Sequence, residues 1–272
     1  MSSMRVALVT EVFFDDPEGY QLTRMLIDAA GRGADIAVLP ELPLNGWSPY
    51  SKVAKDEDAE PVGGPRQARM ANAAREAGVA LVGGAIVTDD DGIRHNTAIV
   101  YDPEGDVISR YRKVHLPEEE GYWETSHYEP GTEPPRVVDA LPLNSGLQIC
   151  SDVNRPQGFQ LLAAQGAEVV FAPRATPPGT YERWRIVLRA NAVMSGAYLV
   201  SVNRPRPENG APIGGPSIAI APDGTVLAET TEPLTIVDLE RSAVHEAAGE
   251  YPGYLKRFAG LYADAWRDLS SS

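Results

Sequence analysis

The alternation of short apolar runs with amphipathic segments is the feature that most limits the folds open to this 272-residue chain. Residues 5–11 and 35–39 are apolar runs typical of buried strands, and residues 21–33 between them place apolar side chains at helical spacing. The alternation continues with a helix expected over 65–78 and a strand over 79–87. Strands that alternate with helices predict an α/β fold, with sheets covered by helices.

The second half of the chain repeats the arrangement of the first. The first half ends in β-like runs at 94–101 and 106–111, joined by the turn-forming segment Asp102-Pro103-Glu104-Gly105, which predicts a hairpin. Later residues show strand and helix patterns again and a second turn at Pro222-Asp223-Gly224. The expected elements are a strand to Ile149, helices over 158–165, 181–195 and 240–247, and strands over 168–172, 198–203, 217–221, 225–229 and 234–239.

The chain has no low-complexity linker, so we expect one domain over residues 1–272, of which 248–272 form a C-terminal tail. Five aromatic side chains make this tail too apolar to remain in water. We therefore expect it to pack on the domain or on a partner subunit, and we expect a homodimer or a larger homo-oligomer. The aromatic residues are Tyr251, Tyr254, Phe258, Tyr262 and Trp266.

Composition excludes several classes of partner. The net charge is −14 and no cluster of Lys and Arg is present, so nucleic acid is not an expected partner. The apolar runs are far shorter than the roughly 20 residues that span a bilayer, and the first residues lack a signal-peptide pattern. We expect a cytoplasmic protein without a membrane span. Its one cysteine, Cys150, cannot form an intramolecular disulfide or a multi-cysteine zinc site.

Three reactive side chains stand at or just after the ends of predicted strands. Glu41 follows the run 36–40, Lys113 follows the strand that ends at Tyr111, and Cys150 ends the strand to Ile149. Strand ends are where α/β folds gather their site residues. A thiol with an ordinary pKa of about 8.5 needs a neighbouring base or cation to become a nucleophile. Glu41 and Lys113 are of the types that supply these two roles.

The segments around these residues resemble the nitrilase, or carbon–nitrogen hydrolase, superfamily. Residues 39–47 (LPELPLNGW), 111–116 (YRKVHL) and 149–156 (ICSDVNRP) are similar to its glutamate, lysine and cysteine blocks, in the same order. Further similarity runs through 124–131, 189–203 and 214–224, so the resemblance covers nearly the whole chain. It implies a four-layer α-β-β-α sandwich, in which two mixed sheets lie face to face with helices outside.

The resemblance also implies a mechanism that needs no cofactor and no metal. Glu41 is then the general base, Cys150 the nucleophile, and Lys113 with the backbone N–H of Ser151 the stabilisers of an oxyanion. The family has a second glutamate beyond the lysine block, and Glu124 is the match, because it is followed by Tyr128 and Gly131 at the family spacing. Residues 118–120, three consecutive glutamates, are expected to form a solvated surface.

Departures from the family pattern bear on the substrate. Asn154 and Gln157 replace the charged residues common in amidase-like members, and Ser151-Asp152 replaces the Trp-Glu that generally follows the cysteine in nitrilases. We therefore expect hydrolysis of a small linear amide or N-carbamoyl compound. Arg155 and Arg174 are candidates for binding a substrate carboxylate, or alternatively members of structural ion pairs. Aromatic side chains expected to wall the acyl pocket are Trp47, Tyr122, Trp123 and Tyr181.

Three alternatives remain open at this point. A nitrilase acting on a small nitrile uses the same residues, and a catalytically silent protein of this fold binds a partner instead. A redox sensor built on Cys150 lacks a second cysteine to resolve it. We expect His115, two residues after Lys113, to have a structural role, since the family uses no catalytic histidine.

Overall fold

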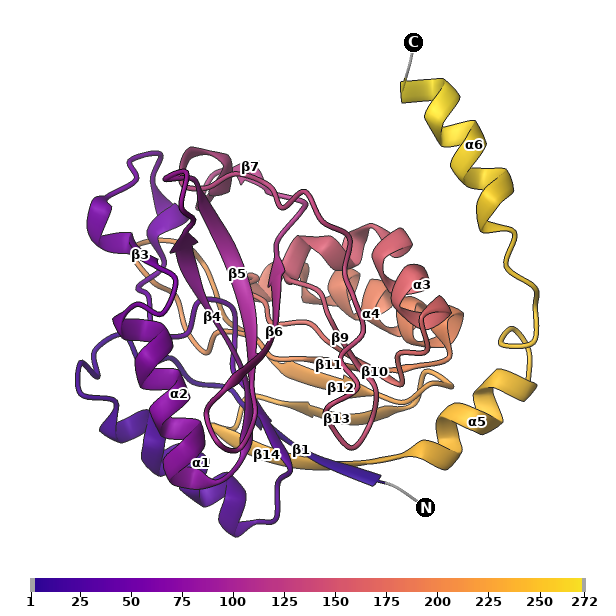
Figure 1. Cartoon of the computed structure of the whole chain (residues 1–272), viewed down its shortest axis with the longest axis horizontal. Helices are drawn as coiled ribbons and strands as arrows, with labels where there is room; N and C mark the ends of the chain where they lie inside the picture. Colours follow the sequence, from indigo (N-terminus) through magenta and orange to yellow (C-terminus); the bar gives the residue numbers. More distant parts are fainter. Residues whose placement is uncertain (1–2, 271–272) are drawn as a thin grey trace.

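Two mixed β-sheets form the centre of the computed structural model, which describes residues 3–270 (Figure 1). The first sheet has the order β14-β1-β2-β4-β5-β6, and β3 pairs with β4. Its parallel pairs are β1–β2, β2–β4 and β3–β4, and the other neighbours are antiparallel. The strands are β1 (Ser3–Val9), β2 (Ile36–Val38), β3 (Ala59–Pro61), β4 (Ala80–Thr88), β5 (Arg94–Tyr101), β6 (Val107–Arg112) and β14 (Leu234–Glu240).

The second sheet has the order β13-β12-β11-β10-β9, with its last three strands parallel. The antiparallel pairs β11–β12 and β12–β13 extend it on the other side. Each sheet thus contains strand–helix units followed by a hairpin, as the sequence pattern predicts. The strands are β9 (Ser145–Leu147), β10 (Val169–Phe171), β11 (Tyr198–Ser201), β12 (Ser217–Ile220) and β13 (Val226–Thr230).

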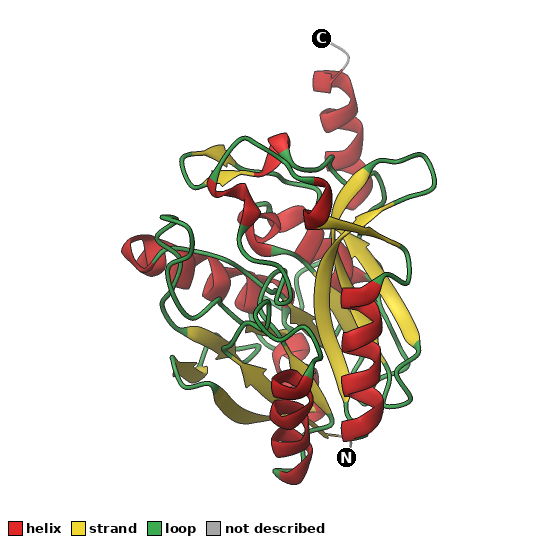
Figure 2. Ribbon diagram, turned by 90° about the vertical axis from the view of Figure 1, so that its left-hand side faces the viewer, coloured by secondary structure: helices red, strands yellow, loops and turns green. Residues whose placement is uncertain are grey.

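Helices cover the outer face of each sheet (Figure 2). α1 and α2 pack on the first sheet, and α3 and α4 pack on the second. No helix in the range 3–270 is long and apolar enough to cross a membrane. The helices are α1 (Tyr20–Gly31), α2 (Pro65–Ala77), α3 (Pro156–Ala164), α4 (Tyr181–Ser195), α5 (Arg241–Gly249) and α6 (Ala259–Ser270).

Each sheet is buried on both faces, and the side chains of its strands alternate between these two faces. In β1, Met4, Val6 and Leu8 point into the layer between the two sheets, whereas Ala7 and Val9 pack beneath α1 and α2. Successive side chains of a strand point to opposite faces, so an uninterrupted apolar run is required where both faces are covered. The four-layer α-β-β-α sandwich expected from the sequence is confirmed.

The segments that carry the candidate site residues leave the two sheets at strand ends. Glu41 follows β2, Lys113 follows β6, and Cys150 follows β9. The backbone N–H of Lys113 donates to Asn96 O at 2.9 Å, which continues the β5–β6 pairing by one residue. Pairing of the two sheets face to face therefore brings together segments that are far apart in the sequence.

Several short elements were not expected from the sequence. They include β3, the small hairpin β7 (Glu118–Glu119) and β8 (Tyr122–Trp123), and 3₁₀ turns such as η3 (Glu124–Ser126) and η4 (Cys150–Asn154). Two or three residues are too few to show a periodicity, so tertiary contacts decide these conformations. As expected, the three consecutive glutamates at 118–120 are exposed.

The C-terminal tail extends away from the sandwich (Figure 1). Its large apolar side chains are exposed, with Tyr251 at 76% and Phe258 at 63%. Packing of these side chains on the chain's own sandwich, one of the two expectations, is not what the structure shows. Contact with a partner subunit stays a prediction.

One close backbone approach yields a test of how the fold places the lysine segment. Gly131 N–H donates to Lys113 O at 2.8 Å, and a Cβ at Gly131 would lie 2.5 Å from Arg112 O. Gly131→Ala therefore forces the Arg112–Lys113 backbone to move. We expect it to lower the free energy of unfolding by about 1–3 kcal/mol, as measured by urea denaturation, and to lower turnover.

Gly31→Ala is the matched control, because a Cβ at this helix residue meets no atom within 4 Å. It should leave the free energy of unfolding unchanged or raise it slightly. Equal stabilities of the two variants would contradict a tight contact at Gly131.

Candidate active site

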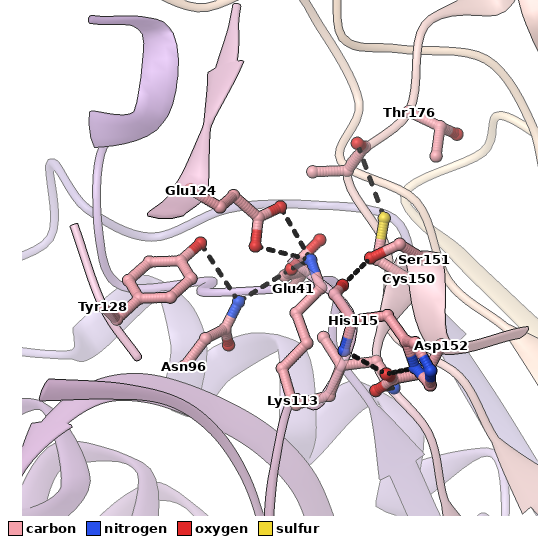
Figure 3. A network of polar contacts seen from close by, with 12 residues as sticks. Glu41, Asn96, Lys113, His115, Glu124, Tyr128, Cys150, Ser151, Asp152 and Thr176 are labelled. Atoms are coloured by element: carbon pink, nitrogen blue, oxygen red, sulfur yellow. Dashed lines mark hydrogen bonds and ion pairs between the residues drawn. The ribbon is translucent and has the colours of Figure 1, made fainter. Parts of the chain in front are cut away.

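A buried ammonium group lies between two buried carboxylates. Lys113 Nζ donates to Glu41 Oε1 at 2.8 Å and to both Glu124 oxygens at 2.7 Å (Figure 3). The side chains of these three residues are fully buried. Three residues from separate segments therefore form one charged array inside the protein.

Cys150 stands at a sharp turn next to this array. It follows the extended residue Ile149 and begins the 3₁₀ turn η4, with a left-handed φ of 45°. Its N–H donates to Pro173 O at 2.8 Å, and its Sγ lies 3.9 Å from Ala175 O. A non-glycine residue adopts positive φ only where the surroundings hold it, so the fold imposes this turn on Cys150.

Neutral side chains complete the surroundings of Glu41. Asn96 Nδ2 donates to Glu41 Oε1 at 2.8 Å and to Tyr128 OH at 3.4 Å. The other carboxylate oxygen of Glu41 is buried and has no hydrogen-bond partner among the described residues. A buried acceptor of this kind costs free energy unless a proton or a ligand reaches it. Glu41 thus keeps one oxygen available for proton transfer.

A buried carboxylate joins the lysine and cysteine segments. Asp152 Oδ1 accepts from the backbone N–H groups of Val114 and His115 at 3.2 and 2.9 Å, and contacts His115 Nδ1 at 2.8 Å. Its other oxygen accepts from Ile149 N–H at 3.2 Å and from Tyr111 OH at 3.0 Å. Asp152 therefore fixes the segment after Lys113 against the residue before Cys150.

The charges in the site act on one another in known directions. Burial alone would lower the pKa of Lys113, but the negative charges of Glu124 and Glu41 outweigh it and raise that pKa above its ordinary value. Burial, followed by the charge of Glu41, raises the pKa of the Cys150 thiol well above its usual range. The resting site therefore holds a protonated lysine and a protonated thiol beside a carboxylate.

Glu124 differs from an ordinary glutamate. Burial raises its pKa to about 7, although the Lys113 charge acts in the opposite direction. With Lys113 positive and Glu41 negative, the charge state of Glu124 decides whether the array is neutral or negative. Such an array can take the proton of the thiol as sulfur attacks, and it can stabilise an oxyanion through Lys113.

Three of the other predicted site residues lie around the array. Trp47 is fully buried, and its indole N–H donates to Gly121 O at 2.8 Å. Trp123 is partly exposed, with Lys52 Nζ 4.0 Å from its ring centroid. Ser151 donates from Oγ to His115 O, so this hydroxyl binds the lysine segment. Their contacts with substrate stay predictions.

The two arginines occupy different environments, and neither pairs with a carboxylate among the described residues. Arg155 is exposed and donates to Asn154 O at 3.3 Å. Arg174 is fully buried, and burial lowers its pKa to about 10. Its guanidinium donates to Ser201 Oγ, Thr176 Oγ1 and Pro216 O. Neutral acceptors thus hold Arg174 in place, and its proposed contact with a substrate carboxylate stays a prediction.

Residue-by-residue interpretation of the sequence missed several polar contributors to the site. Asn96 lies within a strand pattern and Asp152 within the cysteine block. The sequence around them does not indicate which distant residues their side chains contact. Tyr122, by contrast, was expected as an aromatic wall of the pocket, and its OH is buried without a hydrogen-bond partner in the described part of the chain. Burial raises the pKa of this phenol, and the charges of Cys150 and Glu41 raise it to a smaller extent. The Tyr122 hydroxyl therefore interacts electrostatically with both residues.

No cluster of three or more His, Cys, Asp and Glu side chains suited to a metal ion occurs among residues 3–270.

A four-layer sandwich with a buried Glu–Lys–Glu array beside a cysteine defines a class of hydrolase. The model of the carbon-nitrogen hydrolase family matches residues 5–248, so the chain belongs to that family and is an enzyme. This confirms the resemblance to the nitrilase superfamily.

This chain is similar to several known proteins over nearly its whole length. Human omega-amidase NIT2 is 28% identical over 97% of this chain and 98% of its own. A carbon-nitrogen hydrolase from Helicobacter pylori G27 superposes with a TM-score of 0.88 at 20% identity, over 97% of this chain and 98% of its own. A variant of the amidase from Nesterenkonia sp. AN1 is 28% identical with a TM-score of 0.78, over 97% of both chains; it carries the acetamide moiety of fluoroacetamide on its active-site cysteine.

The position of Glu124 yields a prediction about the thiol. Because the negative charge of Glu124 contributes to the raised pKa of Cys150, Glu124→Gln should lower that pKa. The midpoint of the pH profile for alkylation by iodoacetamide should then move to lower pH. Turnover should fall at least 100-fold, because Lys113 loses the partner that binds it through two oxygens.

Glu129→Gln is the control, since Glu129 is exposed and its side chain has no hydrogen bond to the array. Its alkylation profile should match that of the wild type. A midpoint in Glu124→Gln that stays in place or moves to higher pH would refute this account of the site's electrostatics.

Proposed function

We propose that this enzyme is a thiol hydrolase that cleaves the C–N bond of a small linear amide or N-carbamoyl compound and releases ammonia. The observation that carries the proposal is the buried array of Glu41, Lys113 and Glu124 beside Cys150. It provides a base, a cation and a nucleophile within one desolvated site. Homology to enzymes named amidase and omega-amidase supports the same reaction class.

In the acylation step, Glu41 accepts the proton of the Cys150 thiol while sulfur forms a bond to the substrate's carbonyl carbon. The carbonyl electron pair moves to oxygen, where the Lys113 ammonium and the backbone N–H of Ser151 stabilise the negative charge. Collapse of this intermediate breaks the C–N bond, and the nitrogen leaves as ammonia with the proton from Glu41. An acyl thioester on Cys150 remains.

In the deacylation step, Glu41 takes a proton from water as the oxygen attacks the thioester carbonyl. Breaking the C–S bond releases the acid, and the sulfur regains the proton. An N-carbamoyl substrate passes through the same steps: the acid that is released is a carbamic acid, which breaks down to carbon dioxide and the free amine. Glu124 keeps Lys113 in place and contacts the substrate's amide nitrogen.

We assign the acyl pocket to the aromatic side chains next to the array. Tyr122 and Trp47 form an edge-to-face pair with ring centroids 5.8 Å apart, and both are buried in a cluster that also contains Ala175. Arg174 and Arg155 are the proposed sites for an acidic substituent.

A substrate panel tests the function. Ammonia release should occur with wild type on at least one of the short aliphatic amides, N-carbamoyl amino acids and N-carbamoyl amines. Cys150→Ala should reduce it by at least about a thousandfold, because no thioester can form. Circular dichroism of Cys150→Ala checks that the variant is folded.

The same panel separates the alternatives. Turnover of a nitrile in preference to its amide would identify a nitrilase. Absence of turnover together with a thiol that iodoacetamide does not label would favour a partner-binding protein. Activity retained in Cys150→Ala would refute the thiol mechanism altogether.

We also propose that a second copy of this chain covers the exposed tail. On α6, Leu261 and Tyr262 are exposed and continue an apolar stripe at helical spacing that begins at Phe258. Contiguous exposed apolar surface marks an interface in stable proteins. The other copy is the proposed partner because exposed apolar residues of α4, Ile186 and Met194, offer a surface of the same character.

Light scattering measures this assembly. Wild type should have twice the chain mass of 29.3 kDa or a higher multiple. The double variant Phe258→Ser/Tyr262→Ser should shift toward the monomer, whereas Tyr20→Ser, at an exposed tyrosine of α1, should not. A monomeric wild type would refute the proposal.

The cytoplasm is the compartment that we propose, because its reducing conditions keep a catalytic thiol free.

A further inference from the structure

A second buried ion pair, Arg204–Glu208, holds the segment that carries the catalytic base. Arg204 is fully buried and Glu208 is 8% exposed. Arg204 Nε donates to Glu208 Oε1 at 2.9 Å, and Arg204 Nη2 donates to Glu208 Oε2 at 2.6 Å. Neither residue contacts the reacting atoms in the mechanism above, and the free energy of burying such charges requires an explanation.

The other donors of Arg204 reach the backbone of the glutamate segment. Nη1 donates to Glu41 O at 2.8 Å and to Leu42 O at 2.7 Å, and Nη2 donates to Asn45 O at 2.9 Å. A guanidinium has five N–H donors, and together with the two bonds to Glu208 all five are used. Arg204 therefore binds three carbonyl groups within five residues of one loop.

Two of these carbonyls flank a strained residue. Leu42 has a left-handed φ of 51°, a conformation that brings the Cβ of a non-glycine residue too close to the following carbonyl oxygen. Arg204 binds the carbonyl of the peptide before Leu42 and that of the peptide after it. Both peptide planes are thus fixed, and with them the direction in which the Glu41 side chain leaves the backbone toward Lys113 and Asn96.

The same pair reaches the segment of the second glutamate. Glu208 Oε2 also accepts from Trp47 N–H at 3.0 Å, and the Arg204 guanidinium lies 5.7 Å from the centre of the Trp47 ring. The indole N–H of Trp47 in turn donates to Gly121 O, three residues before Glu124. One ion pair therefore connects the loops that carry both catalytic carboxylates.

We infer that Arg204 is a positioning residue for the general base, and that Glu208 holds its guanidinium in the required orientation. The inference rests on the proposed function, in which Glu41 takes the thiol proton. Displacement of Glu41 by about 1 Å is sufficient to lower turnover by about 100-fold. Substrate binding depends on it less, because Arg204 meets the assigned acyl pocket only through the Trp47 ring, and a lysine at this position keeps a cation there.

The test compares Arg204→Lys with wild type on an amide substrate. Lysine keeps the charge but has three donors without the planar fork, so it cannot bind Glu208 and three carbonyls together. We expect kcat to fall at least 30-fold while KM changes less than threefold. In a Glu41→Gln background the same substitution should reduce kcat less than threefold. Once the Glu41 carboxylate has been replaced, moving residue 41 has little further effect on turnover.

Arg241→Lys is the matched control. Arg241 forms a similar two-bond pair with Glu168, at 2.5 and 2.8 Å, away from the catalytic segments. It should lower the melting temperature without lowering kcat. If Arg204→Lys retains kcat, or lowers it by the same factor with and without Glu41, the positioning role is refuted. Should Arg204→Lys not fold, Glu208→Gln serves in its place, with an expected tenfold loss of kcat.

A readout that needs no substrate separates this inference from the proposed function. The charge of Glu41 contributes to the raised pKa of the Cys150 thiol. Arg204→Lys, by moving Glu41 away, should shift the pH midpoint of Cys150 alkylation downward, and Glu41→Gln should shift it in the same direction. A wild type inactive on every substrate would refute the proposed function, whereas an unchanged midpoint in Arg204→Lys would refute the placement of Glu41 by Arg204.

Discussion

The site depends on a lysine ammonium that is buried between two carboxylates. An isolated buried charge would lose its proton or disrupt the core, but Lys113 has partners on Glu41 and Glu124 at 2.7–2.8 Å. These contacts keep the ammonium protonated and hold both carboxylates within reach of Cys150. The array is stable only if three backbone segments arrive at fixed positions, which is what the rest of the structure provides.

The sandwich provides these positions through its strand ends. Glu41, Lys113 and Cys150 each follow a strand, and the two sheets that contribute them are held face to face by side chains such as Val6 and Phe171. Two conformations with positive φ, at Leu42 and Cys150, turn the chain sharply beside the site. Such residues need support from their surroundings, which Arg204 and Asp152 give through hydrogen bonds to the adjoining backbone.

The electrostatics of the resting site indicate how chemistry begins. Burial and the charge of Glu41 raise the pKa of the Cys150 thiol and favour its neutral form, so the proposed nucleophile needs a base that takes its proton. Glu124, with its raised pKa, sets the net charge that the nucleophile experiences. In the proposed mechanism Glu41 moves a proton, whereas Glu124 holds the lysine through both of its oxygens.

The local elements and the reactive residue types could be predicted from the amino-acid sequence alone. The period-two and helical patterns predicted nearly every long strand and helix, because buried faces require apolar side chains at the spacing of the strand or helix. The residues Glu41, Lys113, Glu124 and Cys150 could be selected because they stand in recognisable blocks. The support that these residues receive from Asn96, Asp152, Arg204 and Glu208 depends on how distant segments pack in the folded protein. Arg204 lies 163 residues from Glu41, and no local pattern encodes a hydrogen bond that forms only when two distant loops pack together.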